Sequence, residues 1–406
     1  MQIGENQMRK ERFLMSMYNE ALAIKDTLIA HRRYLHQNPE TGLDLPLTSA
    51  YVEEQLKKMG YEPQRVGSSG LIVTVGKGGG KTFLLRADMD ALPVTEQADI
   101  DFKSTNGRMH ACGHDIHTTS LLGAAQLLKA HEDEIEGTVK LVFQPAEETM
   151  DGGKMMVEAG VCKGVDAAMA IHVATATEEP VGSILMRGVN AKMAAVDWFT
   201  IKVTGKGCHG AMPNNGVDPI NVAAHILIAL EAINARELDP SDNMVLTVGQ
   251  IHGGNTGNVI PNDCMMNGTL RTLKNETRVM IKERMEAIVE NTGKAFRAEA
   301  HIEWGSGCPV MFNDATVYEG IKACLDTLEG VSYKDLGLAI GAMASEDFAY
   351  IANEVPSTLL SLCVGRPSDG CIYPVHHPMV RFDEDGIPSG AAVYAHVAME
   401  WLKNNK

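Results

Sequence analysis

The segment around residue 112 concentrates side chains that bind metal ions. It consists of Met109-His110-Ala111-Cys112-Gly113-His114-Asp115-Ile116-His117 and holds a thiol, three imidazoles and a carboxylate. Cys thiolate and neutral His are the usual ligands of zinc-like divalent ions, and carboxylates complete such sites. The segment alone is equally compatible with a buried cysteine beside surface histidines. A metal site therefore requires matching ligands from other parts of the chain.

Three apolar runs elsewhere in the first half of the chain end on such groups. Residues 82–86 lead into Asp88 and Asp90, residues 139–143 into Glu147 and Glu148, and residues 167–171 into His172. Runs of this kind are typical of strands that are buried on both faces of a parallel sheet. Ligands of open α/β sheets bind beyond the carboxyl ends of the strands. If the strands run parallel, their ends converge on the Cys112/His114 segment.

A further candidate ligand follows much later, in Tyr373-Pro374-Val375-His376-His377-Pro378, just before the last predicted helix. The proposed ligand set is then Cys112, His114, Glu148, His172 and His376. Five ligands are too many for a closed structural zinc site, which takes four. They suit two ions that share a bridging ligand and activate a water molecule. A glycine between Cys112 and His114 would let the backbone bend so that both side chains reach the ions.

The two adjacent glutamates need different roles. We assign Glu148 to the metal and Glu147 to general base, which takes a proton from the water and passes it to the leaving nitrogen. The alternative is a solvated acidic turn, which the position at the end of a buried strand disfavours. Asp90 is a candidate acceptor for the second nitrogen of a ligand imidazole. For Asp88 a role in a turn or cap is equally open.

Length and composition limit the class of protein. A chain of 406 residues is too long for one ordinary core, so two domains are expected. Its net charge of −16 argues against nucleic acid and anionic membranes as partners. We find no apolar run of about 18 residues and no secretory segment, so neither a membrane span nor export is expected. Eight scattered cysteines fit reduced thiols in the cytoplasm.

The middle of the chain differs in pattern from the two ends. Residues 189–305 predict the order βαββαβ, which is typical of a small α+β module with an antiparallel sheet. We therefore expect a domain of α/β class, with a mostly parallel sheet flanked by helices, formed by residues 1–188 and 306–406. The module, of ferredoxin-like order, is inserted between them at 189–305.

Several segments together resemble the aminoacylase/carboxypeptidase metallohydrolase family, in order and over nearly the whole chain. They are Leu85-Arg86-Ala87-Asp88-Met89-Asp90-Ala91-Leu92-Pro93, His110–Asp115, Gln144-Pro145-Ala146-Glu147-Glu148, Ile171-His172 and His376-His377-Pro378. Within that family they are similar to the amidohydrolase branch of hippurate hydrolases, N-acyl-L-amino acid amidohydrolases and auxin-conjugate hydrolases. The resemblance implies two divalent ions per subunit (zinc, manganese or cobalt) and hydrolysis of an N-acyl amino acid to a carboxylic acid and an amino acid.

The resemblance also implies roles within the inserted module. His209, in Gly205-Lys206-Gly207-Cys208-His209-Gly210-Ala211-Met212-Pro213, matches a lid histidine that polarises the substrate carbonyl, often across a dimer interface, so a homodimer through the lid domain is expected. Asn258 and Arg271 match positions that hold the substrate's carboxylate end. The segment Met343-Ala344-Ser345-Glu346-Asp347-Phe348 matches too, without an assigned chemical step.

Two other functions stay open. One is a dipeptidase or carboxypeptidase with the same binuclear centre, which would differ only in what lies on the acyl side. The other is a non-catalytic, metal-dependent protein that binds amino acids or peptides. Binding alone would need the ligands but neither Glu147 nor His209, so the presence of both favours an enzyme.

Overall fold

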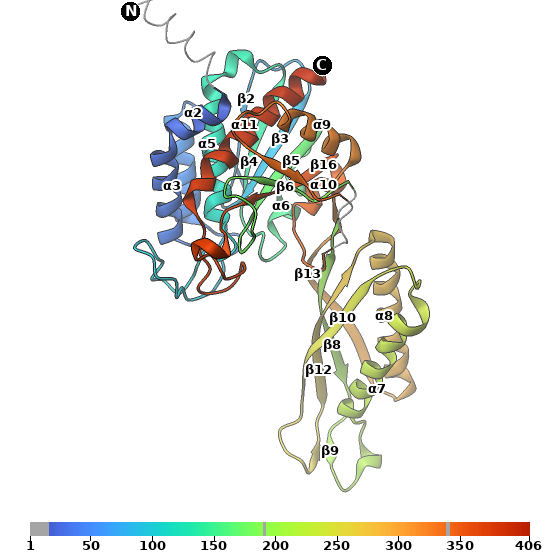
Figure 1. Cartoon of the computed structure of the whole chain (residues 1–406). Coiled ribbons are helices and arrows are strands. Elements are labelled where there is room, and N and C mark those ends of the chain that lie inside the picture. Colours follow the sequence, from blue (N-terminus) through green and yellow to red (C-terminus); the bar gives the residue numbers. More distant parts are fainter. Residues whose placement is uncertain (1–15, 190–191, 338–341) are drawn as a thin grey trace, which may run out of the picture. The chain divides into compact units, whose positions relative to one another are not determined.

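The structure is a computed structural model that describes residues 16–189, 192–337 and 342–406 (Figure 1). The chain divides into two compact units. The first comprises the described residues of Met1–Ala191, Phe312–Ala339 and Asp347–Lys406, and the second those of Lys192–Met311 and Ile340–Glu346. Among the described residues, none of the helices combines the length and the apolar character needed to cross a bilayer.

The first unit is built on one large sheet. Within the described residues its strand order is β1-β2-β4-β3-β5-β16-β6-β15. The strands are β1 (Gln64–Val66), β2 (Gly70–Val75), β3 (Thr82–Asp88), β4 (Thr138–Gln144), β5 (Ala167–Ala174), β6 (Ile184–Met186), β15 (Tyr333–Asp335) and β16 (Ser357–Cys363). The central strands β4, β3, β5 and β16 are mutually parallel, whereas β2 pairs antiparallel with β4. All residues of β16 are buried, and so are all residues of β3 after Thr82. These two strands are therefore covered on both faces of the sheet.

Helices cover this sheet. They are α2 (Met17–Ala23), α3 (Lys25–Gln37), α4 (Pro46–Lys58), α5 (His114–Ala130), α6 (Gly152–Glu158), α9 (Ala315–Leu325), α10 (Ala349–Glu354) and α11 (Ile387–Asn404). The long helices α5 and α11 pack against each other and against β3, and α6 packs against α10. The sequence predicts one helix over residues 12–37. The described part of that range forms two helices instead, because Ile24 leaves helical geometry at φ −106° and ψ 10°, and residues 12–15 lie outside the described residues.

The second unit is a four-stranded antiparallel sheet with two helices. Its order, over the described residues, is β10-β12-β8-β13. The elements are β8 (Ala195–Thr204), α7 (Pro219–Ala232), β10 (Met244–Gly253), β12 (Asp263–Thr272), α8 (Asn275–Ala295) and β13 (Glu299–Cys308), with a separate ribbon of β9 (Cys208–His209) and β11 (Val259–Ile260). Short strands β7 (Lys192–Met193) and β14 (Met311–Phe312) lie where the chain enters and leaves the unit.

Buried and exposed side chains alternate along the strands of the second unit, and the buried ones form its own hydrophobic core. In β8, Phe199, Ile201 and Val203 are buried with residues of α7 and α8, whereas the alternate residues Trp198 and Lys202 are exposed. When β8, β10, β12 and β13 are numbered 1 to 4 along the chain, their order across the sheet is 4-1-3-2, which is that of a ferredoxin-like module. The predicted fold class, a mostly parallel sheet flanked by helices plus a separate antiparallel α+β module, is confirmed.

Candidate metal centre and active site

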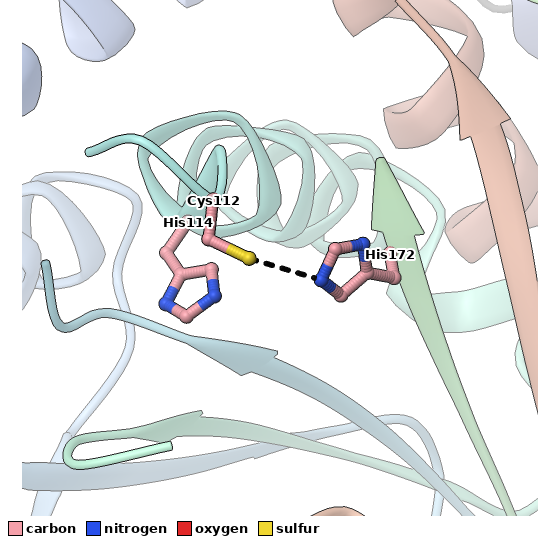
Figure 2. A group of neighbouring side chains, drawn as sticks. All are labelled: Cys112, His114 and His172. Atoms are coloured by element: carbon pink, nitrogen blue, oxygen red, sulfur yellow. Dashed lines mark hydrogen bonds between the residues drawn. The ribbon is translucent and has the colours of Figure 1, made fainter. Parts of the chain in front are cut away.

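The Cys112/His114 segment lies at the start of helix α5. Gly113 is the N-cap residue and has a φ of 82°, a left-handed conformation that glycine adopts readily. A Cβ at this position would meet Val173 Cγ2 at 2.5 Å, so both the conformation and the space demand glycine. The bend that the sequence predicts here is therefore present. It places the Cys112 and His114 side chains near each other, with Cys112 reaching toward His172 (Figure 2).

The five predicted ligands meet at the carboxyl ends of β4, β3 and β5. Cys112 Sγ lies 3.4 Å from His172 Nε2 and 3.2 Å from His376 Nε2. Glu148 Oε1 lies 3.4 Å from His376 Nε2 and 3.8 Å from His114 Nε2. His376 reaches the cluster because its backbone N–H donates to the carbonyl of Ala111 (2.8 Å), which anchors this distant loop beside Cys112.

The spacing of these atoms fits bound cations. Donors that share one tetrahedral ion at bond lengths of 2.0–2.3 Å lie about 3.4 Å from one another, close to the separations observed here. His114 Nε2 and Glu148 Oε1 are buried, and no hydrogen bond reaches them from the described residues. Buried polar atoms without a partner are costly unless something else satisfies them. A metal ion would do so.

The ring of His172 is oriented to offer a lone pair. Its Nδ1 lies 2.8 Å from the carbonyl oxygen of Val173, which can only accept, so Nδ1 carries the proton. Its Nε2 then faces Cys112 as a lone-pair donor. A hydrogen bond from the far ring nitrogen commonly orients a metal-binding imidazole in this way.

Electrostatics favour positive charge in the cluster. Burial alone would raise the pKa of the Cys112 thiol, but the neighbouring His172 and His114 lower it to about 6. Hydrogen bonds to Cys112 and Glu148 raise the pKa of His376 to about 10. Burial opposes charge on His114, yet Asp88 and Cys112 raise its pKa well above the ordinary value. The cluster thus holds protons that a cation would displace on binding.

Asp90 organises the two glutamates. Its Oδ1 accepts from the backbone N–H of Glu147 (3.0 Å) and its Oδ2 from that of Glu148 (3.1 Å). Its Oδ1 also lies 3.4 Å from His114 Nδ1, as expected for an acceptor behind a ligand imidazole. Ala146, at a left-handed φ of 59°, turns the chain so that both N–H groups face this carboxylate. Such a conformation costs on the order of 1–3 kcal/mol and persists where the surroundings enforce it.

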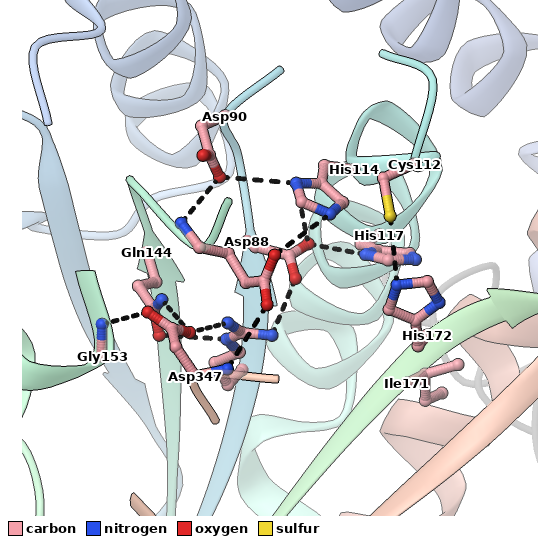
Figure 3. Close-up of polar contacts among 12 residues, drawn as sticks. Asp88, Asp90, Cys112, His114, His117, Gln144, Gly153, Ile171, His172 and Asp347 are labelled. Carbon is pink, nitrogen blue, oxygen red and sulfur yellow. Dashed lines mark hydrogen bonds and ion pairs between the residues drawn. The ribbon is translucent and has the colours of Figure 1, made fainter. Parts of the chain in front are cut away.

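The third histidine of the segment serves a different purpose. His117 Nε2 accepts from the Val173 N–H (2.8 Å), so its Nδ1 donates to Asp88 Oδ1 (2.6 Å). Arg86 Nη1 also donates to Asp88, at 2.7 Å. Burial favours the neutral form of Asp88, but His114, His117 and Arg86 hold its pKa well below the usual range. Asp88 is thus the centre of a buried network (Figure 3), which the sequence alone did not reveal.

The residues predicted in the second unit lie at opposite ends of its sheet. His209 pairs with Val259 in the β9–β11 ribbon, next to Asn258, and both predicted residues are exposed. This ribbon lies beyond the end where Asp263 pairs with Thr204, whereas Arg271 lies at the other end, opposite Val196. Asp263 and Arg271 are eight residue steps apart along β12, about 26 Å at ~3.3 Å per step. One chain therefore does not bring His209 and Arg271 together.

The fold and the ligand cluster define a two-domain metallohydrolase, and comparison with known proteins identifies its family. Residues 84–400 match the profile of peptidase family M20/M25/M40. The N-acetyl-L-cysteine deacetylase of Bacillus subtilis (strain 168) is 36% identical over 386 residues, which cover 94% of this chain and 90% of that protein. Thermostable carboxypeptidase 2 of Saccharolobus solfataricus is 37% identical over 390 residues, covering 94% and 97%. Among solved structures, a dinuclear metal-binding M20 peptidase of Bacillus subtilis matches with a TM-score of 0.76 and 31% identity, covering 94% of this chain and 99% of that one.

The chain belongs to peptidase family M20/M25/M40. It is an enzyme, a metal-dependent hydrolase that acts on amide bonds, and the resemblance noted from the sequence is confirmed.

Proposed function

We propose that the enzyme removes the acyl group from N-acyl amino acids and releases a carboxylic acid and a free amino acid. The observation that carries this proposal is the convergence of five ligands and Glu147 at the ends of three parallel strands. The relative named for N-acetyl-L-cysteine deacetylation supports an acyl amino acid as substrate. Eight cysteines without a disulfide fit a cytoplasmic enzyme.

Two divalent cations suit the ligand set. The ligand atoms fall into two groups of three, Cys112/His114/His172 and Cys112/Glu148/His376, which share the Cys112 sulfur. The residues of these two groups would hold the ions, with Cys112 available to both, and zinc, manganese or cobalt are the candidates. When bound, the ions lower the pKa of a water molecule and stabilise negative charge on the substrate oxygen.

Glu147 is the proposed general base. Its carboxylate is 4% exposed, and its Oε2 lies 4.0 Å from His114 Nε2, on the side of the ligand cluster. From there it takes a proton from the attacking water and returns it to the leaving nitrogen. Glu148, whose Oε1 faces two ligand imidazoles, is assigned to the metal as the sequence predicted.

Arg271 is proposed to bind the substrate's carboxylate, and His209 is proposed to polarise the carbonyl of the amide that is cleaved. Arg271 Nη1 is held by the carbonyl of Met343 (2.7 Å) and by Ser345 Oγ (3.1 Å), and among the described residues it forms no ion pair. Its guanidinium can therefore bind a carboxylate in a bidentate way. His209 Nδ1 accepts from the Ala211 N–H (3.0 Å), so the neutral ring carries its proton on Nε2 and can donate it to a carbonyl oxygen. Asn258 is proposed, as the sequence predicts, to help hold the substrate's carboxylate end.

The separation of these residues supports a homodimer. The carbonyl and carboxylate of an N-acyl amino acid lie within one residue length, about 3.8 Å. In one chain, about 26 Å of strand separates Arg271 from the end of the sheet beyond which the His209 ribbon lies. A second copy must then supply His209 and Asn258. Strand β10 is an edge strand with Val245 and Ile251 40% and 49% exposed. Antiparallel pairing of two β10 strands about a two-fold axis would place the Gly253 end of one chain beside the Met244 end of the other.

A screen of N-acetyl, N-benzoyl and aminoacyl-linked amino acids, with metal analysis of the same sample, tests the proposal. We expect turnover of N-acyl amino acids, two divalent ions per subunit and loss of turnover with a chelator. A preference for aminoacyl-linked substrates would instead support the second candidate function, that of a carboxypeptidase. The similarity to the Saccharolobus relative, which is named a carboxypeptidase, favours this candidate. Full turnover without bound metal would refute both.

A further inference from the structure

The segment Met343–Phe348 contains a buried carboxylate that the reaction as described does not use. Asp347 is 0% exposed. Its Oδ1 accepts from Arg86 Nη2 (2.6 Å) and Gln144 Nε2 (2.7 Å), and its Oδ2 accepts from the Gly153 N–H (2.6 Å). Figure 3 shows Asp347 between Gln144 and Gly153, beside the network that includes Asp88. One side chain thus joins the ends of β3 and β4 to the first turn of α6.

The surrounding sequence is shaped to admit this carboxylate. A Cβ on Gly153 would meet Asp347 O at 2.4 Å and Asp347 Cγ at 3.1 Å. A Cβ on Gly152 would meet the Pro145 carbonyl oxygen at 1.6 Å. Gly153 is therefore needed for the close approach of Asp347, and Gly152 for the close packing of the turn that carries Glu147.

The backbone of Asp347 reaches the proposed base. Its N–H donates to Glu147 Oε1 at 3.3 Å, while Glu147 Oε2 lies on the side of His114. Glu147 Oε1 is thus held by the Asp347 N–H, and Glu147 Oε2 points toward the ligand cluster. The three bonds to the Asp347 side chain fix the position of the N–H group that does this.

We propose that Asp347 is a positioning residue that sets the orientation of the Glu147 carboxylate. This inference rests on the proposed function, because it assumes that Glu147 is the general base. A misplacement of about 1 Å in a reacting group costs on the order of 10²-fold in rate. The alternative is that Asp347 only stabilises the strand ends, in which case its loss would lower stability without a specific effect on turnover.

The test is Asp347→Asn in the full-length, metal-loaded enzyme. The substitution keeps the volume, but in either amide orientation its NH2 group faces a donor, either Gly153 N–H or the Arg86 and Gln144 groups. We expect kcat for an N-acyl amino acid to fall about 10- to 100-fold. We expect KM to stay within about twofold and metal content to be unchanged, because neither Arg271 nor a ligand is touched.

The decisive measurement is a double-mutant cycle with Glu147→Ala. If Asp347 acts through Glu147, Asp347→Asn leaves the residual rate of Glu147→Ala unchanged. The inference would be overturned if the double variant lost kcat by the product of the two single losses, or if Asp347→Asn kept the wild-type kcat. If Asp347→Asn does not fold, Gly153→Ala displaces Asp347 from the other side and is measured in the same cycle.

Asp335→Asn is the matched control. Asp335 also accepts three hydrogen bonds, from Tyr318 Oη (2.7 Å), Lys322 Nζ (2.7 Å) and Gly337 N (2.9 Å), but it lies in edge strand β15. The Asp335→Asn variant should have a lower free energy of unfolding and an unchanged kcat. If wild type shows no turnover, or if Glu147→Ala keeps it, the proposed function itself fails and the inference falls with it. If Glu147→Ala loses turnover but the two substitutions lower kcat multiplicatively in the double variant, only the Asp347 proposal is rejected.

Discussion

Mixing two inactive variants tests whether each active site is shared between subunits. His209→Ala removes a donor to the substrate carbonyl, and loss of one such donor costs about 10²- to 10³-fold in kcat. Arg271→Ala removes the partner of the substrate carboxylate. Both sites of either variant homodimer are defective, since every chain carries the same substitution. Because about 26 Å of strand separates Arg271 from the ribbon that carries His209, we expect the two residues of one site to come from different chains.

In a mixed dimer the defects segregate. One site combines the intact Arg271 of the first chain with the intact His209 of the second, and the other site receives both substitutions. Half of the randomly formed dimers are mixed and half of their sites are intact, so activity should return to about one quarter of wild type. The assay is initial rate on an N-acyl amino acid after co-expression or after unfolding and refolding together.

The chain offers a matched control for this experiment. Asn258 lies next to Val259, the residue that pairs with His209 in the same ribbon, so both should reach the same partner site. A mixture of His209→Ala with Asn258→Ala then leaves no site intact and should not recover. If the His209/Arg271 mixture stays as inactive as its parents, although mixed dimers have formed, the shared site is refuted.

Three further results are expected. Glu147→Ala should lower kcat by several decades with metal content near normal, and full activity would remove it as the base. Cys112→Ala should lower metal occupancy by elemental analysis, because both proposed ligand groups lose their shared sulfur; unchanged occupancy would exclude it as a ligand. His131 hydrogen-bonds Glu20 (3.1 Å) and Glu134 (3.0 Å), which raise its pKa despite partial burial. Its stabilisation is complete below the unfolded pKa of about 6.5 and is lost as pH rises through the raised folded value, so denaturant unfolding should show His131→Ala to be more destabilising near pH 6 than near pH 9.

Much of the site was predictable because strand ends carry its residues. Asp88, Glu147 and His172 each follow or end an apolar run, and the parallel pairing of β4, β3 and β5 brings such ends together. Periodicity likewise predicts the order of the second unit, since its strands alternate between core and surface. The βαββαβ pattern therefore leads directly to the fold observed.

Contacts distant in sequence were not predictable in this way. Asp347 lies 261 residues from Arg86 and 203 from Gln144, and no local pattern indicates either bond. His117 has the spacing of a ligand, one helical turn after His114, yet its environment directs it to Asp88 and Val173. The proposed roles of His209 and Arg271 came from the family resemblance alone, because in this sequence each is typical of a surface residue.

The charges of the site divide into a permanent part and an exchangeable part. Arg86 lies between Asp88 and Asp347, and its guanidinium forms ion pairs with both buried carboxylates without any bound ion. Cys112 and Glu148 lie beside imidazoles instead, and their negative charge is compensated by protons on His114 and His376 or by bound cations. The permanent part also holds the N–H group that contacts Glu147. The proposed base can therefore be oriented before the ions bind, so that metal loading completes a site whose proton acceptor is already in place.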